Sequence, residues 1–198
     1  MTDSEQPRAR GRPDKRRRLV SAAGRVLHEQ GVEATTLADV AAAAGTPVGN
    51  LYYYFKTKDD LTAAVIESHA GEIRAALAAL EQHRTPRARL QAFVRMLGEG
   101  RDAVVRHGCP HGSLCSELDK RDRHLAGMGA ELIRLPIEWA EQQFRALGRR
   151  DARDLAVALI AAYQGIALLT NTLGDPDLMT REVKRLGRWI DALADDRA

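Results

Sequence analysis

The stretch from residue 35 to residue 58 constrains the fold of this chain more than any other part of it. Thr35 or Thr36 suits the N-cap of a helix, because a threonine hydroxyl accepts a hydrogen bond from a free N–H of the first turn. The alanines at 41–44 favour a helix and leave room for another helix to pack closely. Gly45 then ends this helix, since glycine reaches the left-handed C-terminal conformation at little cost.

A second short helix is predicted directly after this glycine. We expect Thr46 to cap it, and Pro47 fits the first helical position, where a missing N–H costs nothing. Leu51 and Phe55 lie four residues apart, so both are expected to face inward and to anchor the helix. A cap, a helix, a glycine and a second cap at this spacing indicate a helix-turn-helix.

The second helix has an unusual surface for so short a segment. Three of the four tyrosines of the chain, Tyr52 to Tyr54, follow one another here. Tyrosine hydroxyls donate to phosphates, and tyrosine rings pack on thymine methyl groups and sugars. Gly49 lets the backbone approach a groove closely, and Lys58 opens the next helix, where a lysine and free N–H groups suit a phosphate. These features predict that the second helix lies against duplex DNA.

Over about residues 14 to 62 the chain resembles the DNA-binding domain of the TetR family of transcriptional regulators. The residues that carry this resemblance are Gly31, Thr35, Thr36, Val40, Ala41, Ala44, Gly45, Gly49, Asn50, Leu51, Tyr52, Tyr53, Tyr54, Phe55, Lys58 and Leu61. Pro47, Val48 and Tyr54 depart from the serine, lysine and histidine of many members. The resemblance implies an all-α chain of about nine helices, with an N-terminal three-helix helix-turn-helix domain and a larger C-terminal helical domain for ligand binding and dimerisation.

The predicted DNA contacts fall into two groups within a segment, Thr46 to Tyr54, that is expected to lie in the major groove. Base contacts are predicted for Val48, Gly49, Asn50 and Tyr52. Phosphate contacts are predicted for Thr36, Tyr53, Tyr54 and Lys58. Two-fold symmetry of a dimer then implies a palindromic operator, with half-sites about one helical turn or more apart.

The charge distribution agrees with a DNA-facing N-terminal part. The net charge of the chain is only +3, but residues 1–58 hold ten Lys and Arg against six Asp and Glu, whereas the rest holds 20 against 21. Excess positive charge beside a helix-turn-helix suits a phosphate-binding face. We expect residues 1–13 to form a flexible basic arm, whose arginines either enter a minor groove or keep the chain soluble. Residues 14–58 would form the DNA-binding domain, and residues 59–198 the ligand-binding and dimerisation domain.

Several classes of protein are disfavoured by what the sequence lacks. We see no apolar stretch of membrane-spanning length and no signal peptide, which predicts a soluble, cytoplasmic protein without a membrane partner. The two cysteines fit a reducing compartment. Since we find no catalytic constellation, nucleotide-binding loop or cofactor motif, we expect no enzyme and no cofactor.

Hydrophobic periodicity predicts helices almost throughout, with no convincing strand pattern. Pro136 is expected to kink one of them, Ser113 to cap a short one, and Asp151 to cap another. The expected helices are 14–30, 59–83, 86–106, 113 to about 119, 124–147, 151–172 and 177–193.

The segment Gly108–Leu118 is the second informative stretch. It is similar to a Gly-Cys-Pro-x-Gly-x-Leu-x-x-Glu-Leu pattern of one subset of TetR-like regulators. Cys109, His111 and Cys115 are too few and too clustered for a structural zinc site, so no metal is predicted. Two readings of Cys109 remain: a thiol that senses oxidants or electrophiles, or a small buried residue in a tight corner.

The remaining candidate residues belong to the C-terminal part. A mostly apolar ligand pocket for an unknown small-molecule effector is expected between the middle helices. Its predicted lining is Phe93, Leu97, His111, Leu114, Cys115, Leu135, Trp139 and Tyr163. The resemblance implies a homodimer interface from the last two helices, and small residues at three- and four-residue spacing favour close helix approach there. Its predicted residues are Ala158, Ala161, Ala162, Gly165, Leu169, Leu186 and Trp189, unless they belong to an ordinary core.

Taken together, these patterns predict a homodimeric, DNA-binding transcriptional regulator. We expect it to act as a repressor that releases its operator when an effector binds. The rival readings are a regulator that switches through Cys109, a thiol enzyme using Cys109 and His111, and a non-specific DNA-compacting protein.

Overall fold

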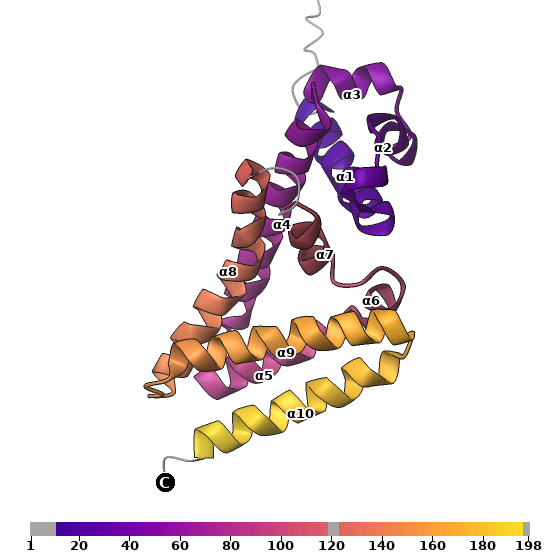
Figure 1. Ribbon diagram of the computed structural model, residues 1–198. Helices are drawn as coiled ribbons and strands as arrows, with labels where there is room; N and C mark the ends of the chain where they lie inside the picture. Colours follow the sequence, from indigo (N-terminus) through magenta and orange to yellow (C-terminus); the bar gives the residue numbers. More distant parts are fainter. Residues whose placement is uncertain (1–10, 119–122, 196–198) are drawn as a thin grey trace, which may run out of the picture. The chain divides into compact units, whose positions relative to one another are not determined.

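A computed structural model describes residues 11–118 and 123–195, with side chains from residue 14. Most of the predicted basic arm (residues 1–10) and the expected end of the short helix at Asp119 lie outside the described residues. Within these ranges every regular element is an α-helix, which confirms the all-α prediction (Figure 1). The helices are α1 (Gly11–Ala34), α2 (Leu37–Ala43), α3 (Val48–Tyr54), α4 (Lys58–Leu80), α5 (Pro86–Glu99), α6 (Arg101–His107), α7 (Pro110–Leu118), α8 (Arg123–Ala146), α9 (Ala152–Leu173) and α10 (Pro176–Asp195).

The chain divides into two compact units, which meet between Ser68 and His69. We predicted the division after residue 58, so the observed one falls ten residues later, inside α4. One continuous helix therefore supplies residues to both units.

The first unit is built on α1. Its buried residues Leu19, Ala23, Val26 and Leu27 recur at helical spacing and form one apolar stripe. Gly31 has φ 82° and ψ 163°, so the helical conformation breaks there as predicted, although helical hydrogen bonding resumes as far as Ala34.

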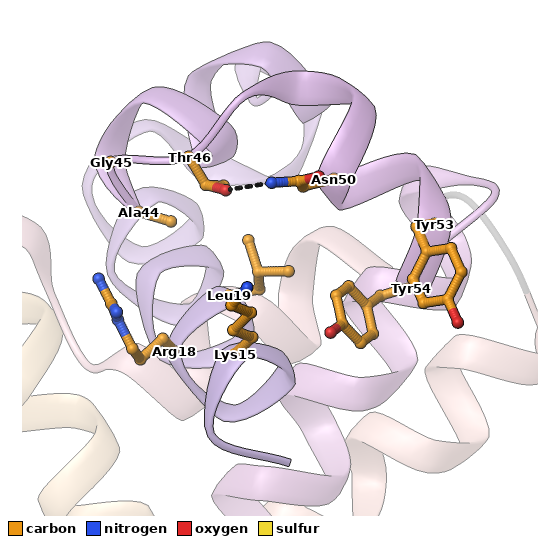
Figure 2. A pocket seen from close by; sticks show the side chains of 9 residues that line it. All are labelled: Lys15, Arg18, Leu19, Ala44, Gly45, Thr46, Asn50, Tyr53 and Tyr54. Carbon is orange, nitrogen blue, oxygen red and sulfur yellow. Dashed lines mark hydrogen bonds between the residues drawn. The ribbon is translucent and has the colours of Figure 1, made fainter. Parts of the chain in front are cut away.

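The turn between α2 and α3 follows the predicted pattern except at one cap. Gly45 has φ 61°, the left-handed conformation expected of the glycine that ends α2. The prediction that Thr46 caps α3 is wrong, because Pro47 occupies the N-cap with ψ 140° and the helix begins at Val48. The Thr46 hydroxyl instead accepts a hydrogen bond of 3.3 Å from the side chain of Asn50 (Figure 2).

The second unit is a helical bundle in which α8 packs on α9 and α10 packs on α5. Its core contains Phe93 beside Trp139, with ring centroids 5.3 Å apart, and Phe144 beside Trp189, at 5.9 Å. Glu81, just beyond α4, accepts hydrogen bonds from the indole N–H of Trp139 at 2.9 Å and from the Gln143 amide at 3.3 Å. The other carboxylate oxygen of Glu81 lies 2.8 Å from Arg89.

One predicted helix and two predicted caps are wrong. The expected helix 86–106 is broken at Gly100 into α5 and α6. The expected short helix begins at Pro110, so Ser113 lies inside α7 and does not cap it. Asp151 precedes α9, but its carboxylate bonds to Arg149 at 3.0 Å and forms no cap hydrogen bond.

The expectation that no stretch is long and apolar enough to span a membrane is also corrected. By length and composition alone α9 qualifies, with a mean hydropathy of 1.5 over its best window. Its alanines and leucines occupy two faces, one directed into the core and one exposed, which makes the whole helix apolar. A core helix of a soluble protein satisfies the same criterion, so this feature is weak evidence for a membrane.

Candidate nucleic-acid interface

The outer face of α3 exposes large apolar side chains. Val48 is 42% exposed, Tyr52 48% and Tyr53 56%, and Gly49 and Asn50 are exposed beside them. Tyr54 is half-buried, with its ring edge-to-face against that of Tyr53 at 5.1 Å. All predicted base-contacting residues therefore lie on accessible positions of one short helix.

The inner face of α3 holds it in place. Leu51 is completely buried and Phe55 is 3% exposed, so the two predicted anchors do face inward. The guanidinium of Arg16, on α1, lies 5.2 Å from the centre of the Phe55 ring, within the range of a cation–π interaction. The buried side chains of Leu51 and Phe55 therefore hold α3 in place while its outer face stays exposed.

Thr36 is the N-cap of α2 and forms a capping box with Asp39, a partner that the sequence analysis missed. The Asp39 backbone N–H donates to the Thr36 hydroxyl at 3.2 Å, and the Thr36 N–H donates to the Asp39 carboxylate at 2.8 Å. The hydroxyl of Thr36 also donates to that carboxylate, at 2.6 Å, and these bonds lower the pKa of Asp39 below its ordinary value. A Thr-x-x-Asp spacing is the signal that finds such a pair.

Lys58 has a structural role that sequence reasoning did not predict. Its ammonium donates to the carbonyl oxygens of Val32 at 2.8 Å, Thr35 at 3.0 Å and Glu33 at 3.2 Å. These three bonds use all of its protons. They attach the start of α4 to the end of α1, and the predicted phosphate contact of Lys58 stays a prediction.

The predicted pocket residues do not form one group. Phe93, Leu97 and Trp139 belong to the core between α5 and α8. His111, on α7, lies 3.2 Å from His69, on α4, measured between ring nitrogens. Tyr163, on α9, packs beside Cys109, and its pKa is raised well above the ordinary value by burial and by that thiol. Leu114 is buried, whereas Cys115 and Leu135 are half-buried.

The predicted dimer residues divide into exposed and core positions. Ala158, Ala161, Gly165 and Leu169 are exposed on α9, and Ala162 is half-buried against the core. Leu186 is 3% exposed within the core of its own chain, and Trp189 is half-buried and packs on Phe144 there. Sequence reasoning missed three further exposed apolar residues on the same helix, which are Val157, Leu168 and Leu173.

The sequence of this chain is similar to sequences of known proteins over most of its length. Residues 19–65 match the family model described as bacterial regulatory proteins of the tetR family. The transcriptional regulator AcuR of Cereibacter sphaeroides is 34% identical over 197 residues, which cover 91% of this chain and 89% of AcuR. The chain belongs to the TetR family. It is therefore a DNA-binding transcriptional regulator and not an enzyme, as predicted.

Two further relatives match this TetR-family chain, one over about half of its length and one over most of it. The regulator BetI of Rhizobium meliloti is 37% identical over 91 residues, 46% of this chain and 45% of BetI. The crystal structure of a regulatory protein TetR from Rhodobacter sphaeroides has a TM-score of 0.77 at 26% identity, covering 87% of this chain and 96% of that one. The shared architecture thus extends through the C-terminal unit. The likeness of Gly108–Leu118 to one subset of the family stays a prediction.

The two cysteines of this TetR-family chain have the surroundings of unreactive thiols. Cys109 is 6% exposed, and its sulfur accepts the Gly112 N–H at 3.4 Å. Cys115 donates to the carbonyl of Gly129 at 3.1 Å, and burial, followed by the neighbouring Cys109, raises its pKa to about 11. Reactive cysteines are accessible and have a lowered pKa. Among the residues that the structure describes, no three His, Cys, Asp or Glu side chains gather as metal ligands.

Replacing Lys58 by methionine tests its role as a connector. Lys58→Met keeps the aliphatic stem but leaves three carbonyls without their donor, of which those of Val32 and Thr35 are in part-buried bonds. The last turn of α1 should therefore lose roughly 1–3 kcal/mol of protection. Hydrogen–deuterium exchange of the peptide around residues 26–36 measures this loss. The control is Lys56→Met, because Lys56 makes a single exposed bond to the Tyr52 carbonyl. Equal exchange in both variants would contradict the connector role.

The alkylation rate of Cys115 should depend on pH as expected for a thiol whose pKa is near 11. Since the thiolate is the reacting form, the rate with iodoacetamide should rise about tenfold per pH unit and keep rising beyond pH 9. Peptide mass spectrometry follows the reaction, with the urea-unfolded chain as the control, whose ordinary thiol pKa is about 8.5. A plateau below pH 9 in the folded protein would show that Cys115 is an activated thiol.

Proposed function

We propose that this chain is a ligand-responsive repressor that binds a palindromic operator as a homodimer and releases it when a small molecule binds the C-terminal unit. The observation that carries the DNA-binding part is the exposure of Val48, Tyr52 and Tyr53 above the buried Leu51. Large side chains left exposed on a well-anchored helix favour a partner that covers them. A regulator of this kind acts in the cytoplasm.

In this proposal α3 lies in the major groove of each half-site. Val48, Gly49, Asn50 and Tyr52 contact base edges, and Thr36, Tyr53, Tyr54 and Lys58 contact phosphates. For these contacts Lys58 gives up at least one of its three carbonyl bonds, and the Thr36 hydroxyl gives up its bond to Asp39. The Nδ2 group of Asn50 donates to Thr46, which leaves its amide oxygen and one N–H for bases.

Gly49 gives independent support for a close approach of DNA. A Cβ built on Gly49 meets no atom within 4 Å, and the residue has no left-handed backbone that would require glycine. Glycine within a helix costs about 0.5–1 kcal/mol relative to alanine. Nothing in the described part of the free chain therefore explains the glycine, whereas a groove lying against this backbone does.

The exposed apolar face of α9 supports dimerisation. Val157, Ala161, Gly165, Leu168 and Leu173 recur at three- to five-residue spacing and share one side of the helix with Ala158 and Leu169. The exposed fraction of both Leu168 and Leu173 is 65%. We therefore assign this face to the interface between two copies, and we leave Leu186 and Trp189 to the core.

The effector site is proposed among the half-buried polar groups that line α4, α7 and α9. His69 and His111 form a pair, and Tyr163 and Cys115 lie on the neighbouring elements of the same unit. A few polar groups in apolar surroundings are typical of small-molecule sites. Because α4 runs from this unit into the DNA-binding unit, we assign it the coupling between effector and operator.

Gly49→Ala separates the folding of this repressor from its DNA binding. Alanine has room in the free chain, so the free energy of unfolding should rise by about 0.5–1 kcal/mol, while operator affinity should fall at least tenfold. The operator is first selected from random duplexes with the purified protein, and affinity is then measured by fluorescence anisotropy.

The matched control is Gly71→Ala, another exposed helical glycine whose built Cβ meets no atom within 4 Å. It should give the same gain in stability with unchanged affinity. Undiminished operator binding by Gly49→Ala would contradict the placement of α3 in the groove. Failure to select any duplex would contradict the proposed function itself.

Leu168→Arg tests the dimer face. An arginine at this exposed position leaves the fold of one chain intact but places a charge in the proposed interface, so the dimer should dissociate. Light scattering after size exclusion should change from twice the 21.8 kDa of one chain to a single chain, and affinity for the palindrome should be lost. Gln142→Arg, an exposed position on α8, is the control. A Leu168→Arg protein that stays dimeric would exclude this face.

A further inference from the structure

A hollow of about 260 Å³ lies in the first unit between the first turns of α1 and the segment that leads into α3. Figure 2 shows its walls, with α1 on one side and the Thr46–Asn50 pair on the other. Its lining consists of Lys15, Arg18, Leu19, Ala44, Gly45, Thr46, Asn50, Tyr53 and Tyr54. None of the roles proposed above uses the two cations of this hollow.

The lining of the hollow has the chemistry of an anion site. Its charged residues are Lys15 and Arg18, it contains no carboxylate, and each of its other polar side chains carries a hydrogen-bond donor. Lys15 and Arg18 are three residues apart on one helix face, where like charges repel one another. An anion in the hollow would remove that repulsion.

The donors of the hollow are available for an outside partner. Within the part of the chain that the structure describes, neither Lys15 nor Arg18 has an ion pair or a side-chain hydrogen bond, whereas the adjacent Arg17 is paired with Asp14 at 2.7 Å. The Thr46 oxygen accepts from Asn50, which leaves the hydroxyl hydrogen free to donate. The hydroxyl of Tyr54 is directed toward Lys15, while that of Tyr53 points away (Figure 2).

We propose that this hollow binds one phosphate of the DNA backbone, held by Lys15 and Arg18 of α1 and by the hydroxyls of Thr46 and Tyr54. This inference rests on the proposed function and adds the first helix to the interface. Phosphate contacts position a protein on the duplex without reading sequence. Because one phosphate is held from α1 and from the α3 segment together, it fixes the depth and direction at which α3 enters the groove.

The salt dependence of operator binding tests this clamp. Each phosphate neutralised contributes roughly 0.9 to the slope of log K against log salt concentration. In the dimer on its palindrome, the double variant Lys15→Ala/Arg18→Ala should lose about two such units, one for each half-site. It should not lose four, since the two cations of each subunit hold the same phosphate. Arg17→Ala is the matched control and should leave the slope unchanged, because Asp14 already pairs with Arg17. All three positions are exposed, so circular dichroism should show unchanged folding.

Neutral methylphosphonate links, introduced one at a time into the selected operator, identify the phosphate itself. At one position per half-site the neutral link should weaken binding of the unmodified protein at least tenfold but hardly affect the double variant. In Tyr54→Phe, the neutral link at this position should weaken binding less than in the unmodified protein but more than in the double variant. If every methylphosphonate weakens both proteins equally, or if Arg17→Ala lowers the slope as the double variant does, the clamp is overturned while operator recognition stands. If the selection from random duplexes yields no preferred sequence, the proposed function itself is contradicted.

Discussion

The burial of Leu51 and Phe55 beneath α3 is the interaction on which the rest of the interface depends. A seven-residue helix is too short to be stable alone, so packing must hold it. Leu51 is fully buried, Phe55 is nearly so, and Arg16 lies over the Phe55 ring. With its inner face fixed in this way, α3 can leave two tyrosines and a valine exposed without losing its position.

The helix α4 is attached by polar groups near both of its ends, each within its own unit. In the first unit Lys58 donates to three carbonyls at the end of α1. In the second unit Glu81, which follows the last helical residue, accepts from Trp139 and Gln143 and pairs with Arg89. Charge-assisted hydrogen bonds are directional, so each end of α4 is held in a defined orientation within its own unit.

The sequence predicted the helix-turn-helix well because its signals are local. The Thr36 cap, the left-handed Gly45 and the inward Leu51 each follow from neighbouring residues. One error is local, since Pro47 occupies the N-cap position that we expected for Thr46. Other residues depend on contacts with distant parts of the chain. Leu186, for example, is buried in the core of its own chain, which its spacing does not indicate. The partners of Lys58 are more than twenty residues away in sequence, so no spacing rule identifies them.

Tyrosine nitration with and without the selected operator tests the central claim most directly. The exposed rings of Tyr52 and Tyr53 should be nitrated by tetranitromethane in the free protein, whereas Tyr163, more than half-buried in the second unit, should react slowly. The account predicts that operator DNA protects Tyr52 and Tyr53, that an unrelated duplex at equal concentration protects them less, and that Tyr163 is unaffected. If Tyr52 and Tyr53 are nitrated at the same rate in the operator complex as in the free chain, α3 does not lie against DNA.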